Sequence, residues 1–195
     1  MYSLILLAYL LGSINSAIII CKCAGLPSPR SVGSGNPGAT NVLRLGSKKA
    51  AFCTLLADVL KGVLPVLLGH ALHFQANALC WIALGAILGH IYPLYFGFKG
   101  GKGVATAMGC AFAINLWLGI SVGALWLISA KISRYSSLSS MISISCMPFI
   151  ALPLLGTRSF APLLFIALLI IFRHRSNIQK LKTGQESKIG QKNKK

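Results

Sequence analysis

Six apolar runs, separated by short polar stretches, limit what this chain can fold into. They cover residues 2–20, 50–72, 76–96, 105–130, 138–155 and 156–172. A helix needs about 20 apolar residues to cross the hydrocarbon core of a bilayer, where it satisfies its own backbone hydrogen bonds. Because only 11% of the residues are charged and 55% are hydrophobic, the pattern predicts an all-α, polytopic membrane protein with little room for a separate soluble domain.

The cations between these runs predict the orientation of the protein. The chain has 19 Lys and Arg residues but only two acids, Asp58 and Glu186. Most of the cations lie in residues 22–49, 97–104 and 131–137 and beyond residue 172. Since Lys and Arg are enriched in the cytoplasmic loops of membrane proteins, we expect these stretches on the inner side.

The run at 105–130 decides the number of crossings. A single crossing there would place Lys131, Arg134 and the basic end of the chain outside, against the usual charge distribution. A break between Asn115 and Gly119, forming two short helices or a re-entrant hairpin, removes the conflict. We therefore expect about seven helical membrane segments, some short or re-entrant, with the N-terminus outside and the C-terminus inside. Residues 1–175 would form the membrane domain and residues 176–195 a basic cytoplasmic tail.

The formal net charge of +17 would indicate nucleic-acid binding in a soluble protein. Here the cations flank apolar runs, and no aromatic residues are interleaved with them in a soluble segment, so no nucleic-acid partner is expected. The stretch from Lys188 to Lys195 is expected to lie near the anionic headgroups of membrane lipids. The six cysteines form no C-x-x-C pair, and neither a disulfide framework nor a metal site is indicated.

The stretch from Gly33 to Arg44, GSGNPGATNVLR, is rich in groups that bind oxyanions. Glycines let successive backbone N–H groups point at one spot, and hydroxyl, amide and guanidinium groups donate to anions. A helix beginning near Ala39 would aim its free N–H groups at the same place. Gly, Asn and Pro also form ordinary turns, but the addition of Thr40, Asn41 and Arg44 favours a site for a phosphorylated molecule.

A second Gly-rich stretch, FKGGKGVAT at residues 98–106, is similar to a phosphate loop but is not a Walker A motif. Gly103 stands where that motif needs Ser or Thr, and the spacing is too short, so ATP hydrolysis is not indicated. Lys99 and Lys102 among glycines at a helix start still predict an anion cradle, although a plain cytoplasmic loop is the alternative. Just upstream, we expect His90 to be a packed, hydrogen-bonded residue rather than a catalyst.

Two further pairs of polar residues stand at helical spacing. His174 and Asn177 are three residues apart and would share a face if the last helix continues, and histidine can exchange a proton near neutral pH. Asp58 and Lys61, three apart within an apolar run, are expected to pair with each other or with a loop Arg, because an unpaired charge in a bilayer is costly. Glu186 is expected to anchor the tail through a salt bridge.

Missing motifs narrow the chemistry. Two acids far apart in the sequence form no obvious carboxylate cluster for Mg²⁺ or Ca²⁺, and there is neither a G-x-S-x-G elbow nor an H-E-x-x-H zinc motif. No histidine has an Asp five residues later, so the His-x4-Asp pattern of many glycerolipid acyltransferases is absent as well. We therefore expect neither a metal nor a cofactor.

Four stretches together resemble one family. Residues 12–17 (GSINSA), 33–44, 89–106 and 174–186 are similar in order and spacing to the bacterial acyl-phosphate:glycerol-3-phosphate acyltransferases over essentially the whole chain. The resemblance implies transfer of a fatty acyl group from acyl phosphate to the 1-hydroxyl of glycerol 3-phosphate. The products would be lysophosphatidic acid and inorganic phosphate, in the first step of bacterial phospholipid synthesis. It also implies a multi-pass protein of the inner (cytoplasmic) membrane, with its active site toward the cytoplasm, beside the soluble enzyme that forms acyl phosphate.

The resemblance also implies roles for individual residues. The catalytic residues would be Ser34, Arg44, Lys102 and His174. The substrate-binding residues would be Gly35, Asn36, Thr40, Asn41, Gly100, Gly101, Gly103 and Asn177. Asp58, Lys61 and Glu186 would be structural. Lys180 departs from the pattern, because family members often carry Arg there, and Lys keeps the charge but loses bidentate contact with a phosphate.

The implied reaction suits these residues. Acyl phosphate is an activated mixed anhydride, so what remains is to position two anions and to stabilise developing negative charge. We hypothesise that a phosphate oxygen of the donor accepts the proton of the attacking hydroxyl, while His174 mainly binds substrate. A membrane transporter for small organophosphate anions is the alternative, and a structural lipid-interaction protein is a third. The polar loops on one predicted side and the lack of an inverted repeat argue against a transporter, and three separate Gly- or His-centred motifs argue against a purely structural protein.

Overall fold

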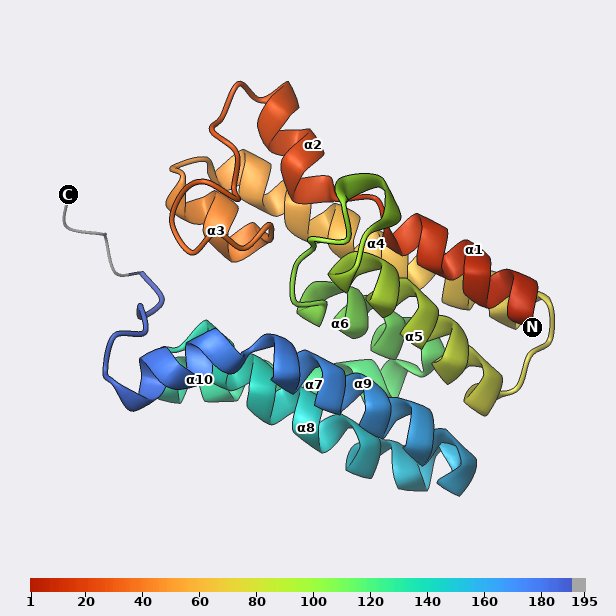
Figure 1. Ribbon diagram of the computed structural model, residues 1–195. Helices are drawn as coiled ribbons and strands as arrows, with labels where there is room; N and C mark the ends of the chain where they lie inside the picture. Colours follow the sequence, from red (N-terminus) through yellow and green to blue (C-terminus); the bar gives the residue numbers. More distant parts are fainter. Residues whose placement is uncertain (191–195) are drawn as a thin grey trace.

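Long helices form most of the part of the chain that the computed structural model describes, residues 1–190. Figure 1 shows α7, α8 and α9 side by side beneath α1, α4 and α5, with α2, α3 and α10 gathered at one end and the N-terminus at the other. The α-helices are α1 (Tyr2–Gly12), α2 (Ser16–Cys23), α3 (Ala39–Arg44), α4 (Lys48–Ala71), α5 (Ala76–Ile91), α6 (Val104–Ile114), α7 (Leu116–Ser133), α8 (Ser136–Leu155), α9 (Phe160–Arg173) and α10 (Arg175–Lys182). Two short 3₁₀ helices cover Leu94–Phe96 and Thr157–Ser159.

Several of these helices are long and apolar enough to cross a membrane. Five stretches within residues 1–190 meet that condition, namely Tyr2–Cys23, Lys48–Ala71, Ala76–Phe96, Leu116–Ser133 and Ser136–Leu155. A sixth is added if α9 with its 3₁₀ turn is counted together with α10, from which it is bent by 56°, and α6 is a shorter apolar helix. The predicted all-α, polytopic membrane fold is confirmed, while the count of seven segments and the orientation of the termini stay predictions.

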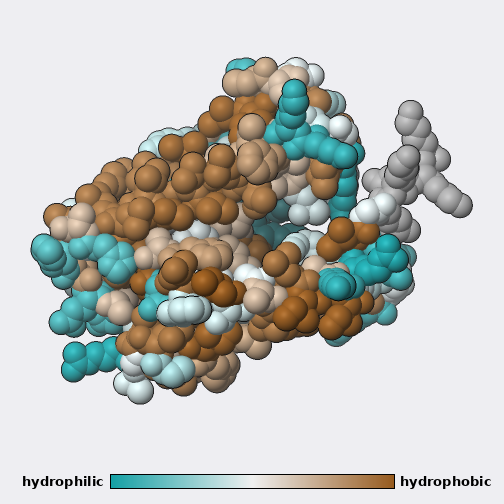
Figure 2. Space-filling model, turned by 180° about the vertical axis from the view of Figure 1, so that it is seen from behind, coloured by the Kyte–Doolittle hydropathy of each residue, from teal (hydrophilic) through white to brown (hydrophobic). Residues whose placement is uncertain are grey.

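The outer surface has the apolar character that lipid contact requires. Large side chains such as Phe52, Leu127 and Phe165 are exposed on outward faces, and Figure 2 shows hydrophobic residues along much of the length of the molecule. The predicted boundary after residue 175 falls at the first residue of α10 and stays a prediction. The predicted headgroup contact of Lys188 to Lys195 falls mostly on residues 191–195, which lie outside the described residues.

The predicted break in the fourth apolar run is confirmed at Asn115. This residue has an extended backbone (φ −157°, ψ 127°), and its side chain caps α7 by accepting a hydrogen bond from the N–H of Leu118 at 3.1 Å. A Cβ added at Gly119 would collide with Phe112, so glycine lets α7 fold back against α6. The two helices therefore form a hairpin, and the loops before α6 and after α7 lie at the same end of the molecule.

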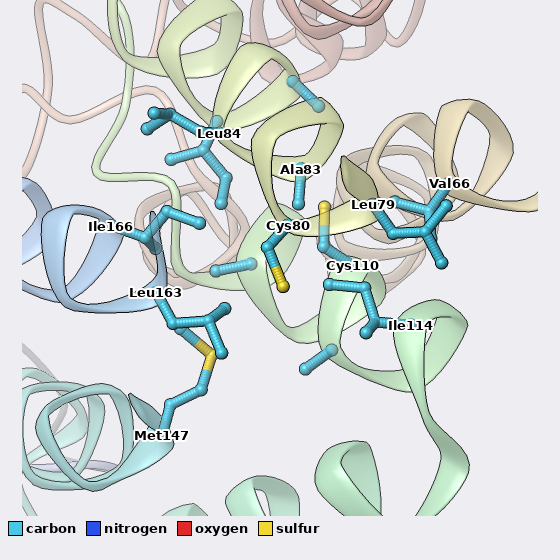
Figure 3. Packing of buried hydrophobic residues seen from close by; sticks show 14 of the residues in the cluster. Val66, Leu79, Cys80, Ala83, Leu84, Cys110, Ile114, Met147, Leu163 and Ile166 are labelled. Carbon is cyan, nitrogen blue, oxygen red and sulfur yellow. The ribbon is translucent and has the colours of Figure 1, made fainter. Parts of the chain in front are cut away.

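Helix α5 lies at the centre of the core. Its side chain Leu79 lies beside Val66 of α4, and Cys80 and Leu84 face residues of α6, α8 and α9 in the same buried cluster (Figure 3). Small residues let neighbouring backbones approach closely, as is common between membrane helices: a Cβ at Gly89 would run into the carbonyl oxygen of Tyr9 in α1. The C-terminal end of α5 is thereby fixed next to the loops that hold the candidate site.

Side chains and backbone groups fasten these loops to one another. The Arg30 guanidinium donates to the carbonyl oxygens of Phe96 (3.0 Å) and Lys99. The Ile189 N–H donates to the carbonyl oxygen of Arg134 at 2.7 Å. Segments that are far apart in sequence thus meet at one end of the helix bundle.

Candidate functional site

A cleft of about 230 Å³ opens between these loops. Figure 2 shows hydrophilic residues on both sides of a hollow at this end of the molecule. No acidic side chain of the described residues lines the cleft, whereas four cations, an amide pair and two hydroxyls do, a set that suits an anion. The lining residues are Ser34, Gly35, Asn36, Gly100, Lys102, Arg173, Arg175, Ser176, Asn177 and Lys180.

The first wall of the cleft is the loop from residue 29 to 38. Asn41 organises this loop: its amide oxygen accepts from the N–H of Ser34 at 2.9 Å, and its amide nitrogen donates to the carbonyl oxygens of Pro29 (2.7 Å) and Val32 (3.0 Å). A Cβ at Gly33, whose φ of +64° lies in the left-handed region, would collide with the same amide. The Asn41 amide is therefore used inside the loop, where it shapes the wall that carries Ser34. Its predicted substrate-binding role stays a prediction.

Two residues predicted for this wall lie beside the cleft rather than in its lining. Thr40 and Arg44 are exposed on the short helix α3 and are not among the lining residues. The charge of Arg44 nevertheless reaches the site, because it helps to lower the pKa of Lys102. The catalytic role of Arg44 and the binding role of Thr40 stay predictions.

The second wall is the loop before α6. The N–H of Gly100 donates to the carbonyl oxygen of Ile91 at 3.1 Å, and the N–H of Gly101 donates to that of His90 at 3.2 Å. These two N–H groups are engaged by the end of α5, while Gly100 still lines the cleft. The substrate-binding roles of Gly100 and Gly101 stay predictions. Of this loop, Gly100 and Lys102 line the cleft, whereas Gly103, the N-cap of α6 with a φ of +86°, does not. The binding role of Gly103 stays a prediction.

Lys102 stands at the centre of the site. Its ammonium group donates to the side-chain oxygen of Asn177, so the predicted loop and the predicted His-x-x-Asn element do meet. Burial is the main reason that the pKa of Lys102 falls from 10.5 to about 8, and the charges of Lys180, Arg44 and Arg173 lower it further against the opposite effect of Glu186. A bound anion would relieve this concentration of positive charge, which favours phosphate at this place.

Glu186 supports Asn177 from behind. One carboxylate oxygen of Glu186 accepts from the Asn177 amide nitrogen at 2.7 Å and from the Ser137 hydroxyl at 2.6 Å. The predicted salt bridge of Glu186 is not found among the described residues, and the carboxylate instead joins the end of the chain to α8 and α10 through hydrogen bonds. Its place in the site is thus to fix the Asn177 amide with its oxygen toward Lys102.

His174 lies at the bend between α9 and α10 and is buried. Its Nδ1 lies 2.8 Å from the carbonyl oxygen of Ile170, and since a carbonyl only accepts, Nδ1 carries the proton and Nε2 is left as an acceptor. Burial, followed by the charge of Lys102, lowers the pKa of His174 to about 4. The ring is therefore neutral near pH 7 and offers a fixed acceptor rather than a strong base.

Comparison with known proteins decides the family. The family model described as "Glycerol-3-phosphate acyltransferase" matches residues 2–184. A glycerol-3-phosphate acyltransferase of Thioalkalivibrio sulfidiphilus is 53% identical over 98% of this chain and 95% of the relative. The chain belongs to the glycerol-3-phosphate acyltransferase family. The resemblance drawn from the four sequence stretches is thereby confirmed.

Solved structures agree with the membership of this family. The glycerol 3-phosphate form of PlsY (YgiH), an integral membrane glycerol 3-phosphate acyltransferase, superposes with a TM-score of 0.91 at 38% identity and covers 97% of this chain and 95% of that one. The lysophosphatidic acid form of the same protein superposes with a TM-score of 0.89, again at 38% identity and with the same coverage. The bundle and its loop-lined end thus belong to an architecture already seen in a membrane acyltransferase.

The site also contains residues that the sequence patterns did not single out. Arg173 and Ser176 line the cleft together with the predicted Asn177 and with Lys180, the position at which the family pattern often has Arg. Their positions, separated by three, one and three residues, repeat the spacing of one helical face, and this spacing in the sequence was the available signal. The Arg173 guanidinium lies 5.7 Å from the ring centroid of Tyr92 and 3.4 Å from the carbonyl oxygen of Gly100, while its Nε is buried without a hydrogen-bond partner among the described residues.

The last predicted pair is confirmed away from the cleft. The Lys61 ammonium lies 2.8 Å from Oδ1 of Asp58, and both side chains are buried. Neither residue is among those that line the cleft. Their structural role stays a prediction.

Proposed function

We propose that this protein transfers a fatty acyl group from acyl phosphate to the 1-hydroxyl of glycerol 3-phosphate. The reaction forms lysophosphatidic acid and releases inorganic phosphate. The observation that carries the proposal is the pairing of Lys102 with Asn177 inside a cleft that is lined by three more cations and, among the described residues, by no acid. Family membership supports the acceptor, and the chemistry of the cleft supports a donor that also bears a phosphate.

Two phosphates must be held for this reaction, and the cleft has donors on two walls. Lys102 and Asn177 form one group, and Arg173, Arg175 and Lys180 extend it along the face of α9 and α10. Ser34 and the loop around it face these cations across the cleft. Fixed positive charge lowers the barrier as negative charge develops on the carbonyl oxygen and on the leaving phosphate.

The attacking hydroxyl must lose its proton. His174 keeps Nε2 as an acceptor, but its pKa of about 4 makes it a weak base. We infer that Nε2 of His174 orients the hydroxyl, while a phosphate oxygen of the donor takes the proton as the C–O bond forms. A His174→Gln variant would then lose affinity and rate without losing an ionisation from the pH–rate profile.

The location of the reaction follows from the charges. The proposed site lies at the end of the bundle where most of the cations gather, and such an end faces the cytoplasm in bacterial membrane proteins. We infer an enzyme of the bacterial inner membrane with its cleft toward the cytoplasm. There it meets soluble glycerol 3-phosphate, acyl phosphate and the soluble enzyme that makes acyl phosphate, and it releases its product to the membrane lipids.

The test is purified full-length protein in detergent with glycerol 3-phosphate and palmitoyl phosphate, without added metal or coenzyme A. Lysophosphatidic acid and inorganic phosphate are expected in equal amounts, and the Lys102→Met variant should form at least 100-fold less. Absence of product from the wild-type protein would overturn the proposal. Uptake of labelled glycerol 3-phosphate into protein-containing vesicles, independent of acyl phosphate, would instead favour the transporter.

A further inference from the structure

A buried polar cluster joins four helices beneath the cleft. Its centre is Oδ1 of Asp58 in α4, which accepts from the Ser16 hydroxyl of α2 at 2.6 Å and lies 2.8 Å from the Lys61 ammonium. Nδ1 of His90, at the end of α5, lies 3.5 Å from the same oxygen and 3.1 Å from the hydroxyl of Thr106 in α6. Each of these five side chains belongs to a residue that is less than 10% exposed.

The cluster also reaches the break between α1 and α2. Lys61 donates to the carbonyl oxygen of Ile14, one of the residues between the two helices, at 2.9 Å. Asp58 and Lys61 compensate each other's charge. Such a group is expensive to place inside a membrane protein, and apolar side chains would hold helices together at lower cost. Polar networks of this kind specify geometry, because each donor and acceptor has a defined direction.

His90 connects this cluster to the loop that carries Lys102. Its carbonyl oxygen accepts the N–H of Gly101, and the next carbonyl, that of Ile91, accepts the N–H of Gly100. On the other side of the ring, Nε2 occupies the space that a Cβ at position 101 would need. The same imidazole therefore touches Asp58 and Thr106 with one edge and packs against the loop with the other.

We propose that Asp58 and His90 are positioning residues for Lys102. Asp58, with Thr106, holds the His90 ring in one orientation, and the ring and carbonyl of His90 set the place of Gly101 and thus the direction in which Lys102 leaves the loop toward Asn177. The expected effect of this positioning on catalysis rests on the proposed function. The placement of Lys102 by His90 is argued from contacts alone and does not rest on it.

Two variants of His90 test the contacts made by the two edges of its ring separately. In His90→Asn the side-chain amide retains a donor near Asp58 but does not reach Gly101, and in His90→Gln it reaches the loop but loses the donor near Asp58. The double variant Asp58→Asn with Lys61→Met removes the cluster's charges together, so that no buried charge is left unpaired. Thr106→Val and Thr106→Ser form a gentler pair that removes or keeps one hydroxyl, and His70→Gln, at the opposite end of the bundle, is the control.

The direct measurement is the reactivity of the Lys102 amine. Full-length protein in detergent is treated with trace acetic anhydride between pH 6 and 10, and acetylation of the peptide that contains Lys102 is followed by mass spectrometry. We expect both His90 variants, the double variant and Thr106→Val to shift the midpoint or rate of Lys102 labelling, while Thr106→Ser and His70→Gln keep the wild-type profile. Wild-type profiles in the folded His90 variants and in Thr106→Val would overturn the proposal.

Steady-state kinetics then test whether a change in the position of Lys102 affects catalysis. For folded variants with a wild-type elution volume and melting temperature, kcat/KM for glycerol 3-phosphate should fall by about 10- to 100-fold, as expected for a displaced catalytic group. A merely structural cluster would lower the yield of folded protein and leave kcat, KM and the labelling profile unchanged. If the wild-type protein forms no lysophosphatidic acid, the proposed function fails, and Lys102 labelling still decides the positioning role.

Discussion

Glu186 accepts a hydrogen bond from the Asn177 side-chain amide at 2.7 Å, and this contact fixes which end of the amide faces Lys102. An amide can turn by half a revolution and exchange its donor for its acceptor. With Glu186 behind it, the nitrogen is held away from the cleft, and the oxygen is left to receive the Lys102 ammonium. Glu186, which follows Asn177 by nine residues, thus controls the orientation of the Asn177 amide in the site.

Removal of this carboxylate should therefore affect catalysis. We expect Glu186→Ala to lower kcat by about 10- to 100-fold, the effect of losing a hydrogen bond to a charged group, because the Asn177 amide is then free to present its nitrogen to Lys102. Glu186→Gln retains an oxygen acceptor and should keep a much larger part of the activity. Initial rates of product formation at saturating substrate measure the difference, and equal losses in the two variants would contradict this role.

The pH dependence of the reaction should report Lys102. Because burial lowers its pKa to about 8, the ammonium loses its proton as the pH rises through 8, and the attraction for phosphate goes with it. We expect kcat/KM to be independent of pH below pH 7 and to decrease by up to about tenfold for each pH unit above pH 8. The limb in kcat should lie at higher pH, because bound phosphate raises the pKa of the amine.

Lys102→Arg provides the control for this profile. Arginine stays charged throughout this range, so the variant should be less active at pH 7, because its geometry differs, but should lack the alkaline limb. Persistence of the same limb in the arginine variant would assign the ionisation to another group.

Arg173 should contribute to phosphate binding. Its Nε is buried without a partner among residues 1–190, and an unpaired buried donor is costly unless a ligand satisfies it. We expect Arg173→Met to raise KM for at least one of the two phosphate substrates by about tenfold or more. Arg173→Lys should raise KM less than Arg173→Met does, because lysine keeps the positive charge but lacks the two parallel N–H groups of the guanidinium. Separate KM values for glycerol 3-phosphate and acyl phosphate would show which phosphate Arg173 binds, and unchanged values for both would contradict its place in the site.

The membrane fold could be predicted because apolar runs and the cations that flank them are properties of whole segments, and they do not depend on the contacts of single residues. Even the break at Asn115 followed from the charges of Lys131 and Arg134, which a single crossing would have placed on the wrong side. The family resemblance implies that Lys102 and Asn177 both act on substrate, but the contact between them depends on how α5, α6 and α10 pack. Local composition did not contain that information.

Three of the predicted substrate-binding residues make internal contacts in the structure. Gly100 and Gly101 are predicted to bind substrate, and in the structure their N–H groups donate to α5 while the absence of side chains makes room for His90. Asn41 is predicted to bind substrate as well, and in the structure its amide closes the loop. In each case the residue type fits both a ligand contact and an internal contact, and only tertiary packing decides between them.

Asn41 gives a last test of that distinction. Asn41→Asp keeps the size and the oxygen that accepts from Ser34, but it replaces the donor to the carbonyl oxygens of Pro29 and Val32 with a second acceptor. If the amide shapes the loop, hydrogen exchange at residues 30–36 should become faster and KM should rise about tenfold, since a buried carboxylate facing carbonyl oxygens is strongly disfavoured. Asn41→Ser, which restores a small donor, should recover part of both properties. Protection of residues 30–36 that matches the wild type, together with a raised KM, would instead return Asn41 to the role of a direct substrate ligand.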